Sequence, residues 1–273
     1  MRMQSPEPQG VKMKQSILLS SALCLFAPAA FAAGPQAGSW SWSVFGGVDR
    51  PLSGDVHDGA TAAVPDLGPL NPDLAGVGAE LRIRSRGHDD IYGSATSYGL
   101  EFSYGIDDRS EVFGQVRRTQ ADKGTVQVGG AFVPALSTTL PVRGTFGDYT
   151  ALTLEGGYRR YFGELGPTRP FVAGRLGATR TDAIRATFAI PDAAITIADV
   201  PFTKSKWSAS AGIDLGLLIP VSEKVSITAQ TGVRYVADLE GDDSAIGGLG
   251  LGSINDTGKR VSYPVSVGLR VDF

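Results

Sequence analysis

The carboxyl-terminal segment alternates between apolar and polar residues with a strict period of two. One face carries the apolar side chains of Tyr263, Val265, Val267, Leu269, Val271 and Phe273, and the residues between them, among them Ser266 and Arg270, form the other face. This period is that of a β-strand with one apolar and one polar side. Because a strand needs neighbours, the chain is constrained to fold as a sheet.

The amino terminus has the pattern of a cleavable export signal. A basic residue, Lys14, precedes an apolar run from Ile17 to Phe26 and small residues that end in Ala30-Phe31-Ala32. The run is shorter than the roughly 20 residues of a spanning helix. We expect residues 1 to 32 to be removed, with residues 1 to 12 an extension from an upstream start. The single cysteine, Cys24, would leave with the signal, so the mature chain would have no disulfide or thiolate chemistry.

Eight alternating segments of outer-membrane strand length follow. No stretch after Ala32 is apolar for the roughly 18 residues of a membrane helix, so a membrane location would require a barrel. The alternative is a secreted soluble β-sandwich, whose exposed faces would be less apolar. The predicted strands are Trp40 to Asp49, Ser97 to Ile106, Glu111 to Gln120, Tyr149 to Phe162, Pro170 to Thr181, Trp207 to Pro220, Val225 to Leu239, and a last strand that closes at Phe273.

The connections alternate between long and short. Long ones span about 50 to 96, 121 to 148, 182 to 206 and 240 to 260, and short turns follow the second, fourth and sixth strands. The fold class is therefore all-β: an eight-stranded antiparallel up-and-down transmembrane barrel with four long external loops. Residues 33 to 39 would form a short periplasmic segment. Three arginines on the outward phase, Arg118, Arg160 and Arg180, fall near strand ends, where a cation at the membrane interface costs little.

The inward phase carries charges of both signs at corresponding depths. An eight-stranded barrel is just wide enough for side chains to fill it, and isolated charges there would be expensive. We therefore predict an interlocked salt-bridge network that plugs the lumen, with a charged selectivity constriction as the alternative. Its members are Glu101, Arg117, Glu155, Arg159, Arg175, Asp214, Arg234, Asp238 and Arg270.

Candidate catalytic groups are few. The two histidines, His57 and His88, fall in the first long connection. Gly87-His88-Asp89-Asp90, with Asp242-Asp243 in the last loop, offers the residue types of a water-activating His/Asp pair, although a solvated polar loop explains it as well. The glycine-rich run from Gly247 to Gly252 lacks the lysine and the following helix of a phosphate loop. We expect no cofactor, no metal and no enzyme activity, and the absence of a basic, aromatic patch argues against nucleic acid.

The strand pattern and the closing aromatic residue resemble those of the small Gram-negative outer-membrane β-barrels, of the OmpA transmembrane-domain, OmpX, OmpW and Opa type. The resemblance covers residues 40 to 273. It implies a porin-like cell-envelope protein in the cell outer membrane, surrounded by outer-membrane lipids. It also implies that the barrel-assembly machinery reads the alternating strand that ends at Phe273 as an assembly signal.

Three classes of function remain open at this point. The first is a structural or surface-interaction barrel whose loops bind an extracellular ligand, and alternating segments within the loops, Thr125 to Val133, Arg185 to Ile190 and Ala194 to Val200, favour it by suggesting external hairpins. The second is a small OmpW-like channel for small or hydrophobic solutes. The third is an envelope enzyme, either an omptin-like protease or a lipid deacylase.

Overall fold

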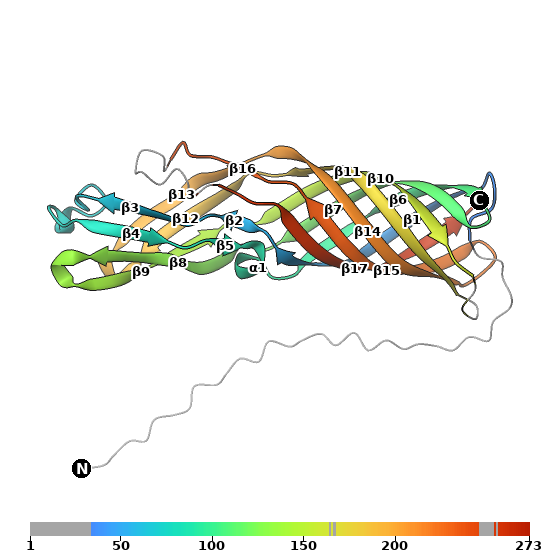
Figure 1. The fold of residues 1–273 in the computed structure, drawn as a ribbon, viewed down its shortest axis with the longest axis horizontal. Coiled ribbons are helices and arrows are strands. Elements are labelled where there is room, and N and C mark those ends of the chain that lie inside the picture. The colour runs from blue at the N-terminus through green and yellow to red at the C-terminus, as the bar shows by residue number, and fades with distance from the viewer. Residues whose placement is uncertain (1–33, 164, 166–167, 246–253, 255) are drawn as a thin grey trace, which may run out of the picture.

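A computed structural model describes residues 34 to 163, 165, 168 to 245, 254 and 256 to 273. The predicted signal peptide and the glycine-rich run from Gly247 to Gly252 lie outside the described residues. Eight antiparallel strands close into a barrel in the order β1, β17, β15, β14, β11, β10, β7, β6, which confirms the predicted fold class (Figure 1). These strands are β1 (Trp40–Ser53), β6 (Ala95–Asp107), β7 (Ser110–Ala121), β10 (Tyr149–Tyr161), β11 (Arg169–Thr181), β14 (Lys206–Pro220), β15 (Val225–Val236) and β17 (Arg260–Asp272).

The alternation in the sequence becomes the inside and the outside of the barrel. In β7, Glu111, Phe113, Gln115 and Arg117 are buried, whereas the residues between them are exposed. The first and last strands close the barrel by pairing from Ser41 with Asp272 through to Ser53 with Val261, with one shift in register near Pro51. A slip of one residue would exchange the two faces, so the polar interior and the apolar exterior fix the register together.

Short turns, the segment that precedes β1 and the carboxyl terminus lie at one end of the barrel. The β6–β7 turn is closed by Asp107, whose carboxylate accepts from the backbone N–H of Arg109 at 2.7 Å. The segment before β1 lies against this turn, because the N–H of Gly38 donates to the carbonyl of Gly105 at 2.9 Å. The turn from 221 to 224 joins β14 and β15, and β17 ends beside it, where the N–H of Asp272 donates to Lys224.

At the opposite end, the long connections form a second sheet that extends beyond the barrel (Figure 1). Its seven strands are β3 (Ala60–Val64), β4 (Ala79–Ile83), β8 (Gly124–Val133), β9 (Thr138–Phe146), β12 (Ile184–Ile190), β13 (Ile195–Lys204) and β16 (Glu240–Gly241), in the order β16, β13, β12, β9, β8, β4, β3. The hairpins expected from the alternation inside the loops are therefore present, and they are joined to one another edge to edge.

The hairpins β8–β9 and β12–β13 end in the same way. Each tip is a short 3-10 turn that begins with proline, Pro134–Leu136 in one and Pro191–Ala193 in the other. The next residue, Ser137 or Ala194, adopts a left-handed backbone with φ of 49° or 50°. A non-glycine residue in this region carries strain, which the flanking strand pairs hold in place.

A short part of the first connection folds inward under this sheet. It comprises β2 (Asp55–His57), β5 (Arg86–Gly87) and α1 (His88–Ile91), with β2 and β5 paired to each other. We call these segments together with the seven-stranded sheet the external cap. No helix in the described part of the chain is long and apolar enough to cross a membrane.

Candidate functional site: the filled lumen and the external cap

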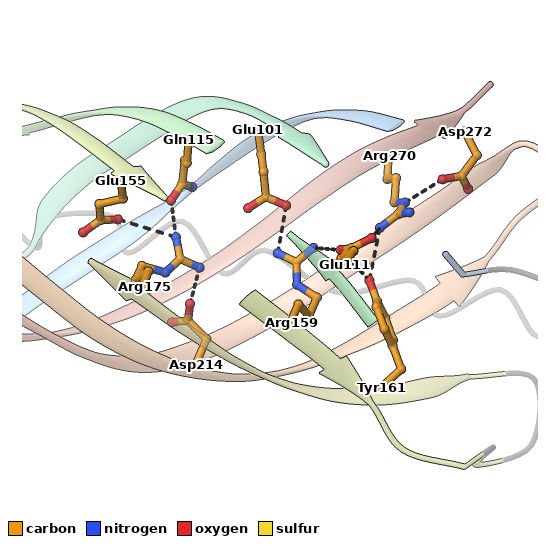
Figure 2. Close-up of polar contacts among 10 residues, drawn as sticks. All are labelled: Glu101, Glu111, Gln115, Glu155, Arg159, Tyr161, Arg175, Asp214, Arg270 and Asp272. Carbon is orange, nitrogen blue, oxygen red and sulfur yellow. Dashed lines mark hydrogen bonds and ion pairs between the residues drawn. The ribbon is translucent and has the colours of Figure 1, made fainter. Parts of the chain in front are cut away.

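Two groups of buried charges occupy the lumen. The first group lies on β7, β10, β11, β14 and β15 and centres on Arg175, which contacts Asp214 and Gln115 directly and lies 3.6 Å from Glu155 (Figure 2). Asp214 also accepts from Arg234 at 2.5 Å. The group contains three arginines and two carboxylates: Arg117, Arg175, Arg234, Glu155 and Asp214.

The second group lies nearer the short turns and centres on Glu111. Its carboxylate accepts from Arg159 Nη1 at 2.5 Å, from Arg270 Nη1 at 2.7 Å and from the Tyr161 hydroxyl at 2.9 Å (Figure 2). Arg159 also donates to Glu101 at 2.8 Å, and Arg270 donates to Asp272. Three carboxylates and two arginines meet here.

The charges of the two groups therefore compensate each other. The first has one excess positive charge, the second has one excess negative charge, and an aromatic ring lies between them. The guanidinium carbon of Arg159 is 4.8 Å from the Phe113 ring centroid, and that of Arg175 is 5.0 Å from it. Such contacts favour the cations when water is excluded. A buried network of this kind persists only when nearly every charge has a partner.

Glu155 is the least satisfied member of the network. Its carboxylate lies 3.7 Å from Arg117 and 3.6 Å from Arg175, beyond hydrogen-bond distance. Neither of its oxygens has a hydrogen-bond partner among the described residues. The pairing is therefore electrostatic, and Glu155 is more weakly fixed than Asp214 or Glu111.

The structure brings together eight of the nine residues predicted for the network. The exception, Asp238, is a correction, because it is exposed and lies beyond Val236, where β15 ends. The predicted strand runs to Leu239, past the end of β15. After Val236 the alternation between buried and exposed residues changes phase, so Leu239 is buried and Asp238 is exposed.

Several other buried residues of the lumen are not predicted by the sequence analysis. Glu111 and Asp49 follow the inward phase and could have been found from it. Arg260, which donates to Asp49 at 3.2 Å, lies before the predicted start of the last strand. Gln115 and Tyr161 carry no formal charge, so a search for charges passes over them.

Above the charged groups the barrel mouth is closed by small, apolar and aromatic side chains around one further buried ion pair, Asp49–Arg260. Thr153 and Thr179 share a hydrogen bond of 3.0 Å across β10 and β11. The next layer contains Ala95, Ala121, Tyr149 and Ala151, which belong to the same apolar cluster as the interior of the external cap. That interior is continuous from the barrel to the hairpins, and its most buried large members are Val56, Val128, Phe146, Ile184 and Phe202.

Both histidines lie in this apolar interior, which corrects the expectation of a solvated polar loop. His57 Nδ1 donates to the carbonyl of Asp58 at 3.0 Å, and its ring stacks on Phe146. His88 packs against Tyr92 and Tyr149. The Nε2 atoms of both histidines lack hydrogen-bond partners in the described part of the chain.

Burial keeps both imidazoles neutral. It lowers the pKa of His57, and it lowers the pKa of His88 to about 3, with the nearby Arg260 adding to the second effect. The predicted His/Asp pair is not assembled. Asp89 and Asp90 point to solvent, and Asp90 accepts from the backbone N–H of Gly87 instead. No group of three or more potential metal ligands occurs among the described residues.

The outside of the barrel is a belt of exposed apolar side chains bounded by aromatic residues. At the end with the short turns, Trp40 and Tyr104 lie with ring centroids 4.9 Å apart, and Phe273 pairs with Trp40 through its backbone. Arg160 lies in this boundary, donates to Ser110 and approaches Asp107 of the turn at 3.8 Å. Towards the external cap, the belt ends at Tyr98, Trp207, Tyr235 and Tyr263.

A closed barrel of eight antiparallel strands, polar inside and apolar outside, with short turns at one end and long connections at the other, is the architecture of a small outer-membrane β-barrel. No family model matches the chain, and no curated protein matches it.

Solved structures show similarity at low sequence identity. Neisserial surface protein A is 14% identical, with 87% of this chain and 98% of that chain covered and a TM-score of 0.40. OprG from Pseudomonas aeruginosa is 18% identical, with 89% and 99% covered and a TM-score of 0.39. Ail, the attachment invasion locus protein of Yersinia pestis, is 14% identical, with 87% and 100% covered and a TM-score of 0.39.

Proposed function

We propose that this chain resides in the cell outer membrane, where its plugged barrel carries a rigid external surface with a structural or binding role. The proposal rests on one observation, that the barrel is closed at two successive levels along its axis. The charged groups fill the lumen, and the apolar interior of the external cap covers the barrel mouth. A protein built to conduct solutes would keep a water-filled path through both levels.

The membrane location is supported by the outward belt. Its exposed leucine, valine and isoleucine side chains would be an aggregation hazard in water, and aromatic residues border the belt at both ends. Outer-membrane lipids would therefore surround β1, β6, β7, β10, β11, β14, β15 and β17.

The proposed role at the surface is supported by the rigidity of the external cap. Its sheet is continuous across all four connections that contribute strands, and its inner face has its own core. Further hydrogen bonds join separate connections: Arg86 donates to the carbonyl of Gln127, and the Tyr92 hydroxyl donates to that of Gly147 at 2.9 Å. A pre-organised surface loses little entropy on binding, which suits an extracellular ligand held by the loops.

We also propose that the barrel-assembly machinery recognises β17 with Phe273. The apolar side chains of this strand, Tyr263, Val265, Val267, Leu269, Val271 and Phe273, face outward in the phase expected from the sequence, and most are exposed. A factor that binds the strand before the barrel closes would have this apolar face available for contact.

Surface labelling tests the location and orientation. We expect a membrane-impermeant maleimide to label Asp192→Cys, at the tip of the β12–β13 hairpin, on intact cells of a Gram-negative host. Glu223→Cys, in the β14–β15 turn, should react only after the outer membrane is opened. Because Cys24 is the single native cysteine and lies in the predicted signal, each introduced thiol would be unique in the mature chain. Equal labelling of both positions on intact cells would refute the orientation.

Planar-bilayer recording tests the closure of the lumen. The folded wild-type barrel should show no steady single-channel current, because buried side chains occupy the lumen throughout. The Arg175→Ala variant serves as the comparison, since Arg175 lies at the centre of the first charged group. Stable wild-type current steps whose ion selectivity changes in Arg175→Ala would instead establish a water-filled channel.

A further inference from the structure

Two arginines interrupt the outward apolar belt in a single row. Arg118 on β7 and Arg180 on β11 are both paired in register with Leu152 on β10, so they lie at the same height. Tyr98 pairs with Arg118 on one side, and Trp207 pairs with Arg180 on the other. The row is thus the boundary of the belt on the side of the external cap.

Neither arginine has an acidic partner in the part of the chain that the structure describes. Some exposed arginines of the cap do pair with carboxylates, such as Arg82 with Glu80 and Arg185 with Asp199. No ion pair among the described residues includes Arg118 or Arg180. Their contacts are neutral, since Arg180 Nε donates to Ser205 at 3.3 Å and Arg118 reaches the amide oxygen of Gln120 at 3.0 Å once that amide is oriented to accept.

On the same outward face, four residues further into the belt, two neighbouring glycines leave a gap between the side chains, which we call the trough. Gly114 on β7 and Gly156 on β10 are paired in register there, and the positions flanking them in the row are Phe102 and Leu176. Phe102 is 57% exposed and Leu176 is 71% exposed, so the two walls stand out from the surface. A Cβ added at Gly114 would meet no atom within 4 Å, and one at Gly156 would meet only a carbonyl oxygen at 3.8 Å.

These glycines are therefore not required by packing inside the barrel. Glycine weakens a strand interior, where a residue with a side chain would be favoured. Their effect in this position is to leave the belt hollow between two large apolar side chains.

From this arrangement we propose that the outward face of β6, β7, β10 and β11 is a binding site for one phosphorylated lipid. Arg118 and Arg180 bind its phosphates, and the trough over Gly114 and Gly156 receives an acyl chain. The inference rests on the proposed membrane location, which puts the arginine row at the outer-leaflet interface.

The spacing of the arginines indicates the kind of headgroup. They lie on strands separated by one other strand, so their Cα atoms are roughly 10 Å apart. Two guanidinium groups at this separation suit two phosphates better than one, and each phosphate can accept paired N–H bonds from one arginine. The glycine pair lies roughly 13 Å along the strands from the row, within the apolar belt. We therefore commit to a glycolipid with two phosphate groups.

Native mass spectrometry of the purified, refolded barrel tests the site, with bisphosphorylated lipid A as the probe. The wild type should retain one lipid, with an affinity at least fivefold higher than for monophosphorylated lipid A. Arg118→Gln with Arg180→Gln should weaken binding at least tenfold and abolish the preference between the two lipids. The control is Arg143→Gln, an exposed arginine on β9 outside the belt, which should bind as the wild type does.

A second pair of variants tests the trough independently. Gly114→Val and Gly156→Val should leave the barrel folded, with unchanged heat-modifiable mobility, and yet weaken lipid retention at least fivefold. Wild-type affinity in the arginine double variant would overturn the site, and wild-type affinity in the valine variants would overturn the trough. Displacement of the lipid by millimolar inorganic phosphate would show a site for free phosphate and refute the lipid. Since these measurements use purified protein, their failure is distinguishable from a failure of surface labelling.

Discussion

Replacing Glu111 with glutamine is expected to lower the free energy of unfolding by about 3 to 5 kcal/mol. The side chain is fully buried and accepts from Arg159, Arg270 and Tyr161. Glutamine keeps the shape but removes the charge, so Arg159 and Arg270 lose the carboxylate they share and the two lumen groups together gain one excess positive charge. Because domains are stable by about 5 to 15 kcal/mol, the loss is large. Urea unfolding of the folded barrel in lipid vesicles measures it.

The matched control is Asp192→Ala at the exposed tip of the β12–β13 hairpin, which should change stability by no more than about 0.5 kcal/mol. A second variant separates charge from packing: adding Arg270→Gln to Glu111→Gln should recover part of the loss, since the excess positive charge is removed. A loss below about 1 kcal/mol in Glu111→Gln would mean that solvent screens these charges, and the lumen would then be wet.

Acid should open the external cap before it unfolds the barrel. The ordinary histidine pKa is about 6.5, whereas burial holds the pKa of His88 at about 3 and lowers that of His57. Below pH 6.5 the opened cap binds protons that the closed cap does not, so the closed form loses stability as pH falls and is unaffected above that range. The slope is about 1.4 kcal/mol per pH unit for His88, or about 2 kcal/mol at pH 5. The lowered pKa of His57 adds to this loss in the same direction.

Hydrogen exchange of the cap amides between pH 7.5 and pH 5 measures this effect, after correction for the intrinsic pH dependence of exchange. The interval lies above the range in which most carboxylates titrate. His88→Phe, which keeps a ring beside Tyr92 and Tyr149, should remove the contribution of His88, and adding His57→Phe should remove most of what remains. A cap whose opening free energy is the same at both pH values in the wild type would rule out the neutral, buried state of these histidines.

The barrel could be predicted from the sequence because the alternation within each strand shows which residues face the lumen and which face outward. Alternation in β7 separates Val112 and Val116 from Glu111 and Arg117 without knowledge of the neighbouring strands. The closed topology then follows from the number of segments and the lengths of their connections. The failure at Asp238 shows the limit of this reasoning, since an alternating pattern continues in the sequence after the last backbone pair of the strand has been made.

The external cap could not be derived in this way. Val56 and His57 are buried because strands from other connections surround them, and their own neighbours, Asp55 and Asp58, predict exposure. The pairing of β4 with β8 and of β9 with β12 joins connections that are far apart in the chain. Local patterns showed the hairpins, but which edges meet depends on how the barrel brings the connections together.

The near-continuity of barrel and cap strands has a consequence for how this surface can diversify. Only two residues separate β7 from β8 and β11 from β12, and one separates β13 from β14. A single inserted residue in such a strand would turn the following side chains from one face to the other. Lineages of this protein should therefore accumulate length changes at the proline-initiated tips, Pro134–Leu136 and Pro191–Ala193, and should vary elsewhere by substitution. Sequence divergence would then alter the ends of the hairpins while their flanks keep a constant length.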